Sequence, residues 1–458
     1  MGILSAMNNS VGGIAAQSFA LENISGNIAN SQTTAYKRTD TSFSDLVQSS
    51  TSNVQRMTAG NVMASSRSTI GLDGDTQTDD VDTHMAIRGT GFFQVNTGDV
   101  GSEPNLYTRR GDFALDADGY LVNGSGYSLL GYSLPVADGS VNALQRIRIN
   151  KDSINAEATK NVVYALNLPT TPQTAFSTST LGKGSTVSDI WQAGGSSGIT
   201  GDTRTGPVAA VTNTELDEFI ANSVSGGSIT SYDSQGTAVN LSLRWAKTGT
   251  NEWALYYQSA PSTSTTDPIW TQIPSGTSAS STFPDSFHFN PNGTMVEDAS
   301  ALAVTGVTVN GVSLGTIDMA ITATQFADSN GKITQKTFTQ DGSPVGYFDS
   351  MSINDAGKIV YAYTNGKTEE KWDIPLVTFR GQSALKPMDG GAYSETMESG
   401  SPSVFDDGKI VGSALESSNV DISEEFTKLI VTQQAFSANS KVITTADQMM
   451  SDILNIIR

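Results

Sequence analysis

The residues that could do chemistry in this sequence are few, and their spacing argues against an active site. The chain has two histidines, His84 and His288, which lie far apart in sequence, and it has no cysteine. Neither a disulfide framework nor a thiolate metal site is therefore possible. A metal or nucleophile site built on histidine alone is not expected either. We predict that the chain is not an enzyme and that it holds no metal and no cofactor.

Three other stretches resemble ligand sites but fit better as structural features. GTGFF, residues 89–93, begins like a dinucleotide-binding loop, yet it lacks the third glycine and precedes a strand rather than a helix. The three aspartates of GDFALDADGY, residues 111–120, hint at a calcium loop without its full pattern or its closing glutamate. The Asp-Gly pair in that stretch predicts a hairpin turn instead. The pair Glu369 and Glu370 fits a solvated face at the end of a strand.

Composition excludes several classes of partner. The net charge of −20 argues against a nucleic-acid surface, which requires clustered Lys and Arg. No apolar run approaches the ~18 residues that indicate a membrane span, so membrane insertion is not expected. Nothing before Lys37 is positively charged, so the basic start of a secretory signal peptide is missing. Taken alone, this favours a cytoplasmic protein or one that is exported without cleavage.

Both ends of the chain carry apolar residues at alternating steps of three and four, the spacing of a coiled-coil seam. Asp421 and Glu424 are placed to form an N-cap and capping-box pair at the start of the C-terminal helix. That helix would be about 55 Å long, which exceeds the width of a small domain. We therefore expect the two terminal helices to pair with each other and with copies from other subunits. The predicted subunit-interface residues are Leu4, Met7, Val11, Ile14, Leu21, Ile28, Phe426, Leu429, Phe436, Ile443, Met450, Leu454 and Ile457.

The middle of the chain predicts β structure. Eleven Asn-Gly and Asp-Gly dipeptides, the strongest short hairpin signal, all lie between residues 73 and 408. VTVNGVSL, 307–314, is a clear strand–turn–strand, and only TELDEFIANS, 214–223, indicates a helix within this part. The predicted fold class is a mainly β multi-domain body with paired N- and C-terminal α-helices that form a coiled-coil-like inner domain.

Several segments together resemble the bacterial flagellar rod and hook proteins. GNIANSQTTAYKR at 26–38 is similar to the N-terminal motif of that family, and residues 414–450 are similar to its C-terminal motif along their whole length. Residues 107–132 resemble its core hairpins, and residues 231–258 and 343–367 resemble its hook members. Ala35 departs from the glycine that the family usually has there, so the turn at this point could differ. The positions that match the family motifs are Asn27, Asn30, Tyr36, Lys37, Asn419, Asp421, Gln434 and Asn439.

The resemblance implies a structural subunit that polymerises into the curved, flexible tube of the hook and transmits motor torque to the filament. It implies four parts: a helical inner-tube domain (1–28 with 422–458), an extended connecting arm (29–72 with 409–421), an inner β domain (73–150 with 333–408) and one or two outer β domains (151–332). The implied partners are copies of the chain itself, other axial proteins (distal rod, hook cap and hook–filament junction) and the flagellar type III export apparatus. The implied location is the extracellular hook, reached without a cleaved signal peptide.

Two alternatives stay open from the sequence. Within the family, the chain could be a large distal-rod or other axial protein, although rod proteins of this group are shorter and lack a large insert such as 151–332. From a different class, it could be a secreted β-rich adhesin or hydrolase. An adhesin would not need helical seams at both ends, and an enzyme would need a convergent polar cluster that the sequence does not show.

Overall fold

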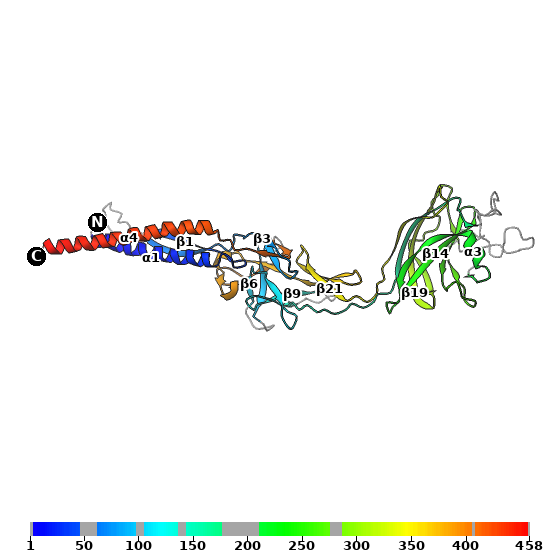
Figure 1. Cartoon of the computed structure of the whole chain (residues 1–458), viewed down its shortest axis with the longest axis horizontal. Helices are drawn as coiled ribbons and strands as arrows, with labels where there is room; N and C mark the ends of the chain where they lie inside the picture. The colour runs from blue at the N-terminus through cyan, green and yellow to red at the C-terminus, as the bar shows by residue number, and fades with distance from the viewer. Residues whose placement is uncertain are drawn as a thin grey trace, which may run out of the picture. The chain divides into compact units, whose positions relative to one another are not determined.

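The chain folds into two compact units, each of which is described separately (Figure 1). Unit 1 comprises Met1–Lys151, Asp349–Ala362 and Thr368–Arg458, and unit 2 comprises Asp152–Phe348 and Tyr363–Lys367. Unit 2 is therefore inserted into the sequence of unit 1. This computed structural model describes residues 3–45, 62–97, 105–135, 143–175, 210–274, 286–404 and 408–456.

Each end of the chain forms one long helix in unit 1, as the 3–4 spacing predicts. Helix α1 spans Ile3–Ala29 and α4 spans Ile422–Ile456, and the two lie side by side (Figure 1). Asp421 is the N-cap of α4, since its Oδ1 accepts the backbone N–H groups of Ser423 at 2.8 Å and Glu424 at 3.2 Å. Among the described helices, none is long and apolar enough to cross a membrane.

The segment after α1 folds back instead of running out as a single extended arm. Strands β1 (Thr39–Asp45) and β2 (Val62–Ser68) pair antiparallel, and both contact α1. The asparagines of α1 explain this return: the Asn23 amide donates to Thr41 Oγ1 at 2.9 Å, and Asn27 bonds to the backbone of Thr39. The sequence-based expectation of an extended arm over 29–72 thus needs correction, because polar side chains on α1 hold β1 against the helix.

The rest of unit 1 is β structure. A sheet of 13 strands runs in the order β21-β22-β23-β9-β5-β6-β26-β25, with five further strands paired beside this path. Its core joins Phe92, Tyr107 and Phe379, whose rings meet edge to face. Two further pairs, β3 with β29 and β4 with β28, lie outside this sheet. The strands of the sheet and of these pairs are β3 (Thr76–Thr78), β4 (Met85–Arg88), β5 (Phe92–Asn96), β6 (Leu106–Thr108), β7 (Phe113–Leu115), β8 (Leu121–Asn123), β9 (Ser128–Ser133), β10 (Gln145–Arg146), β21 (Phe348–Ile353), β22 (Lys358–Tyr363), β23 (Thr368–Asp373), β24 (Leu376–Thr378), β25 (Lys386–Pro387), β26 (Ala392–Ser394), β27 (Ser403–Val404), β28 (Lys409–Gly412) and β29 (Ala414–Glu416), with short 3-10 turns η1 (Gln382–Ala384) and η2 (Asp389–Gly391).

Unit 2 consists of two sheets around one shared core. One sheet has the order β18-β19-β11-β20 and the other β12-β16-β15-β14-β13, and residues of both belong to a single apolar cluster. The unit continues past the predicted boundary at residue 332 because β20 pairs with β11. Its elements are β11 (Asn161–Leu168), β12 (Ala210–Val211), α3 (Leu216–Asn222), β13 (Ser223–Tyr232), β14 (Ala238–Gly249), β15 (Glu252–Gln258), β16 (Trp270–Ile273), β17 (Phe287–His288), β18 (Leu302–Val309), β19 (Val312–Gln325) and β20 (Thr334–Gln340).

Two of the predicted turn signals join paired strands, as expected. Asn310 and Gly311 have φ of 50° and 83° and join β18 to β19, with Val309 opposite Val312, as VTVNGVSL predicts. Residues 116–120 likewise join β7 to β8. Asp73 and Gly74 differ: they form no hairpin, and they lie beside Glu416 in the cluster described below.

Candidate assembly interface and the junction that supports it

The two terminal helices meet along a line of mostly small residues. On α1 the buried positions that face this contact are Ser10, Gly13, Ala16, Ala20, Ile24 and Asn27. A Cβ added at Gly13 would lie 2.8 Å from Nδ2 of Asn439 on α4, so glycine permits this close approach. Glycine inside a helix costs roughly 1 kcal/mol relative to alanine. The close packing against α4 is the structural reason for Gly13.

The predicted interface residues flank this contact rather than form its centre. Eight of them, on both helices, are half-buried, whereas Val11 and Phe426 are 52% and 51% exposed. Leu4 and Leu454 lie within the helices, and Ile457 lies outside the described residues. The eight half-buried residues are Met7, Ile14, Leu21, Ile28, Leu429, Phe436, Ile443 and Met450. Their role between subunits stays a prediction.

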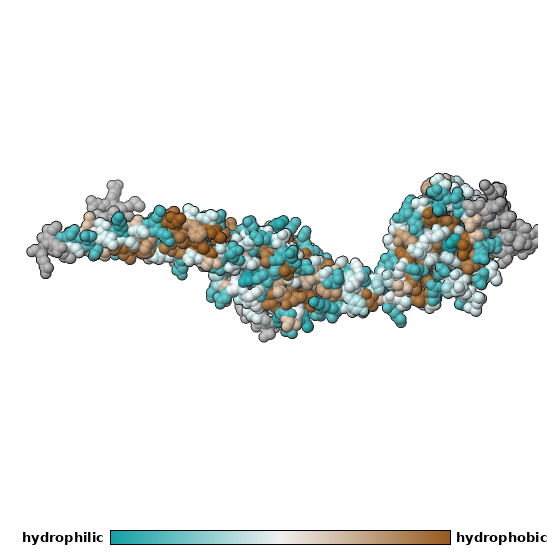
Figure 2. Space-filling model, viewed as in Figure 1, coloured by the Kyte–Doolittle hydropathy of each residue, from teal (hydrophilic) through white to brown (hydrophobic). Residues whose placement is uncertain are grey.

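Sequence reasoning missed other large apolar residues that α4 leaves exposed. The 3–4 spacing identifies only one apolar stripe along the helix, and these residues lie on its other faces. Figure 2 shows hydrophobic residues gathered on the surface of the helix pair. A largely apolar groove runs between Ala6 of α1 and the stretch of α4 from Ala438 to Met449. The exposed large apolar residues of α4 that lie outside the predicted seam are Ile422, Ile430, Val431, Val442, Met449 and Ile453.

Asn27 ties α1 to α4 and to the hairpin. Its amide donates to Glu425 Oε2 and to the carbonyl of Thr39, both at 3.0 Å, and its Oδ1 accepts the N–H of Thr39 at 2.9 Å. Tyr36 donates to the same Oδ1 at 3.4 Å. Glu425 is fully buried and also accepts from Lys428 at 2.8 Å. This one asparagine therefore satisfies polar groups of three elements in a place that excludes water.

The start of α4 is fixed from outside the helix as well. Glu424 at the third helical position bonds Arg38 at 2.9 Å and Lys428 at 3.0 Å. The hydrogen bonds from Lys428 and Arg38 lower the pKa of Glu424 below its ordinary value. Glu424 thus links α4 to the chain just after α1. Of the predicted capping box, Asp421 forms its half by accepting backbone N–H groups of the first turn. The Glu424 carboxylate instead forms the ion pairs with Arg38 and Lys428.

An ionic cluster with a buried centre, which we call the junction cluster, lies where the chain leaves α1 and where it returns to α4. It consists of Lys37, Asp73, Arg109 and Glu416, two cations and two anions. Glu416 accepts from Lys37, from Arg109 at 3.4 Å and from the N–H of Gly74 at 2.8 Å, and Arg109 also bonds Asp73 at 2.7 Å. The side chains of Lys37, Arg109 and Glu416 are each only 1% exposed, whereas Asp73 at the edge of the cluster is 45% exposed.

The junction cluster gives GTGFF a structural role. Arg109 donates to the carbonyls of Gly89 at 2.6 Å and Gly91 at 3.1 Å, which supply the remaining acceptors of the guanidinium. Burial lowers the pKa of Lys37, while the attraction of Glu416 works in the opposite direction. Removing one partner from such a cluster is costly because an uncompensated buried charge remains.

The other motif residues support the same junction. Asn419 accepts the N–H of Arg38 at 2.7 Å and donates to the carbonyl of Leu72 at 3.2 Å. Asn30 donates to the carbonyl of Gly26 at 2.9 Å near the end of α1. Ala35 adopts a φ of 54°, the left-handed conformation that glycine favours. Gln434, in contrast, lies exposed on α4.

The two histidines and the aspartates of GDFALDADGY form hydrogen bonds and ion pairs with nearby residues of the chain. His84 Nδ1 lies 2.9 Å from Asp79 Oδ2, and His288 Nδ1 lies 2.6 Å from Glu297 Oε1. Asp116 accepts the N–H groups of Asp118 and Tyr120 within its turn. Over the described ranges, no group of three or more His, Asp or Glu residues is placed to hold a metal ion.

Comparison with known proteins gives consistent matches along the chain. Family profiles match at residues 411–456 (Flagellar basal body rod FlgEFG protein C-terminal), 86–163 (Flagellar hook protein FlgE/F/G D1 domain) and 205–343 (Flagellar basal body protein FlaE D2 domain). The Flagellar hook protein FlgE of Rhizobium meliloti (strain 1021) is 28% identical over 480 residues, covering 100% of both chains. That of Escherichia coli (strain K12) is 28% identical over 462 residues, covering 98% of this chain and 100% of the other.

The fold is also similar to a solved structure. The crystal structure of Helicobacter pylori flagellar hook protein FlgE2 matches with a TM-score of 0.51 and 16% sequence identity. The match covers 74% of this chain and 100% of that one. It supports the mainly β fold with terminal helices.

Proposed function

Since the chain belongs to the family of bacterial flagellar rod and hook proteins, we propose that it is the structural subunit of the hook and polymerises through α1 and α4 into a curved, flexible tube. The full-length similarity to proteins named flagellar hook protein supports the hook over the rod. The family is structural, and the residues examined for chemistry in this chain serve its turns and ion pairs.

The observation that carries the assembly mechanism is the set of apolar residues that α4 keeps outside its contact with α1. Val431, Val442 and Met449 are 60%, 44% and 53% exposed. Burying one such side chain contributes roughly 1.5–3 kcal/mol. A helix with apolar residues on several faces is suited to a place among other helices. Copies of the same helix pair would supply those neighbours in the polymer.

The junction cluster and Asn27 suit the transmission of torque. They connect α1, α4, the β1–β2 hairpin and the inner β structure through buried ion pairs and hydrogen bonds. Such satisfied networks hold their members in one arrangement. We propose that force applied to the helix pair reaches the β structure of unit 1 through this junction. Unit 2 then supplies the outer contacts that change as the hook bends.

The further partners follow from the same assignment. Copies of this chain are the main partner, and the ends of the polymer would meet other axial proteins: the distal rod, the hook cap and the hook–filament junction. We also propose export through the flagellar type III apparatus without a cleaved signal peptide, to a final place in the extracellular hook.

Electron microscopy of the purified protein tests the assignment and its mechanism together. Wild type should form curved tubes, and Met449→Asp should abolish them because the interface would bury an unpaired carboxylate. Met449→Leu is the matched control, since it keeps the side chain apolar and nearly conserves its volume. Circular dichroism should show both variants folded. Absence of tubes from wild type would contradict the function, and normal tubes from Met449→Asp would contradict the proposed role of α4.

A further inference from the structure

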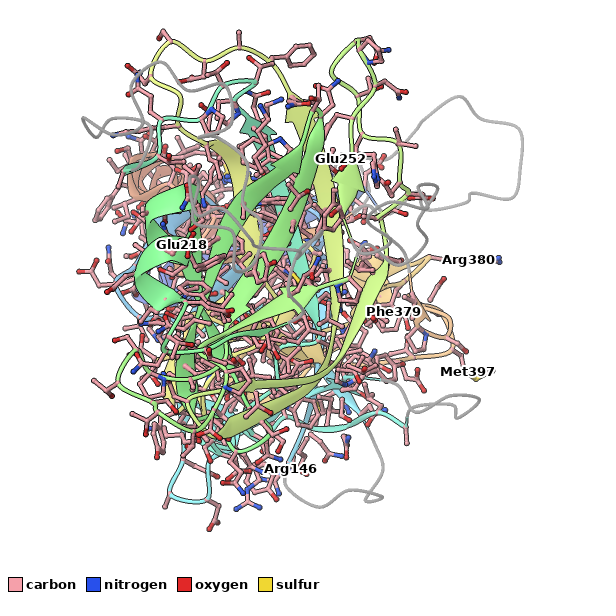
Figure 3. The ribbon with its side chains drawn as sticks, turned by 90° about the vertical axis from the view of Figure 1, so that its right-hand side faces the viewer. Arg146, Glu218, Glu252, Phe379, Arg380 and Met397 are labelled. Atoms are coloured by element: carbon pink, nitrogen blue, oxygen red, sulfur yellow. The ribbon has the colours of Figure 1, made fainter. Side chains whose placement is uncertain are left out.

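The strand around β10 places two arginines on one face of unit 1. In the sequence Arg146-Ile147-Arg148-Ile149 both isoleucines are buried, so the alternation of a strand turns both arginines outward. Arg148 is exposed and Arg146 is half-buried, and Arg146 is labelled near the lower edge of Figure 3. The two guanidinium groups therefore lie near each other at the surface.

Tyr120 holds these arginines in place. The guanidinium carbon of Arg146 lies 3.9 Å from the centre of the Tyr120 ring, and that of Arg148 lies 5.7 Å from it. Arg148 also donates through Nε to the carbonyl of Asp118 at 2.9 Å. We call Tyr120, Arg146 and Arg148 the arginine platform.

The arginine platform lacks an anion within the described part of its own chain. Neither arginine forms an ion pair with a described residue, and the buried Nε of Arg146 has no hydrogen-bond partner there. Two like charges held side by side repel each other, and a guanidinium matches a carboxylate through paired donors. The platform is therefore an ordered cationic site that is complementary to carboxylates.

A turn of the same unit, which we call the acidic turn, carries exposed carboxylates that are complementary in charge to the arginine platform. Asp80 and Asp82 are exposed, and no described residue forms an ion pair with them. The neighbouring Asp79 bonds His84, and the N–H of His84 donates to the carbonyl of Val81 at 3.1 Å, which shapes the turn. The two free carboxylates are two residues apart in sequence, as the two arginines are.

We propose that in the polymer the arginine platform of one copy binds the acidic turn of a second copy, each guanidinium holding one carboxylate. The proposal rests on the proposed function, because it requires an assembly of copies. Each chain carries a net charge of −20, so copies repel one another unless local cations meet anions at their contacts. A surface patch that binds a different patch of the next copy makes a head-to-tail contact, the kind that extends into a filament.

The critical concentration for assembly tests the contact. We expect Arg146→Gln with Arg148→Gln to raise it about tenfold at low salt, the equivalent of two partly exposed ion pairs. The increase should shrink to about twofold at high salt, because salt screens the wild-type attraction. Asp80→Asn with Asp82→Asn should have the same effect. Arg380→Gln is the control, since Arg380 is an exposed arginine that projects from the edge of Figure 3 and should leave assembly unchanged.

A cross-linking experiment identifies the partner directly. Arg146→Lys keeps the charge and allows a carbodiimide to join its amine to a carboxylate in contact with it. Tubes assembled from a mixture of light- and heavy-nitrogen subunits should yield mixed-label peptides that join position 146 to Asp80 or Asp82. Wild-type tubes with no change in assembly for either double variant would overturn the proposal, as would cross-links only within one copy or only to other acids. Failure of wild type to form tubes would instead contradict the proposed function.

Discussion

Unit 2 and the terminal helix pair differ in where several of their largest apolar side chains lie. In unit 2, Trp245, Trp253 and Phe287 are fully buried between the two sheets. On α4, by contrast, Phe426 and Val431 are more than half exposed. Unit 2 thus buries these aromatic residues within its own fold, whereas α4 exposes apolar area that, under the proposed function, copies of the chain would cover. Under the proposed function, the described core of unit 2 needs no partner, whereas the helix pair would gain its missing neighbours on assembly.

The largest effect is expected from a cavity in unit 2. Trp245→Ala should lower the free energy of unfolding of that unit by about 3–5 kcal/mol. It removes the ring contact with Phe287 at 5.2 Å and leaves the hydroxyl of Tyr164 without the indole donor at 3.2 Å. Hydrogen exchange measured peptide by peptide should show faster exchange in unit 2 and unchanged exchange in α1 and α4. If exchange in α1 and α4 became faster to the same extent, the helix pair and unit 2 would unfold together rather than separately.

In unit 1, Glu416→Gln should lower the free energy of unfolding by about 3 kcal/mol. The two buried cations Lys37 and Arg109 would then face only one anion, Asp73. Adding Lys37→Met should recover part of this stability, since the cluster becomes neutral again. Urea unfolding followed by hydrogen exchange would report both values. If the double variant were less stable than Glu416→Gln, the charge balance of the cluster would not be the cause.

The smallest effect concerns pH at the start of α4. The pKa of Glu424 is lower in the folded chain than its ordinary value of 4.5, so its contribution is present above that value and is lost as the pH falls through the folded pKa. Because the side chain is 48% exposed, we expect only about 0.5 kcal/mol. The difference in melting temperature between wild type and Glu424→Gln should be small at pH 7 and should disappear once the pH lies well below the folded pKa. A difference that grew in acid would contradict this sign.

Local features were predictable because short-range rules decide them. The 3–4 spacing predicted α1 and α4, Asn310-Gly311 predicted the β18–β19 hairpin, and Asp421 predicted the cap of α4. The Asp73-Gly74 pair looked equally like a hairpin and was not one, because its backbone is used by Glu416 from a distant part of the chain. Tertiary contact overrode the local signal there.

The sequence by itself therefore determined the two terminal helices, the β character of the middle of the chain, the resemblance to the flagellar rod and hook proteins, and the apolar character of both chain ends. These follow from periodicity, turn residues and local hydrogen bonds, which act over a few positions. Only the tertiary structure decided which face of α1 meets α4, because small residues such as Gly13 allow a closer approach than the larger neighbours that score as a seam. The junction cluster was also decided only by the tertiary structure. Lys37, Arg109 and Glu416 are separated by tens to hundreds of residues in sequence, and they form ion pairs only because folding buries them side by side.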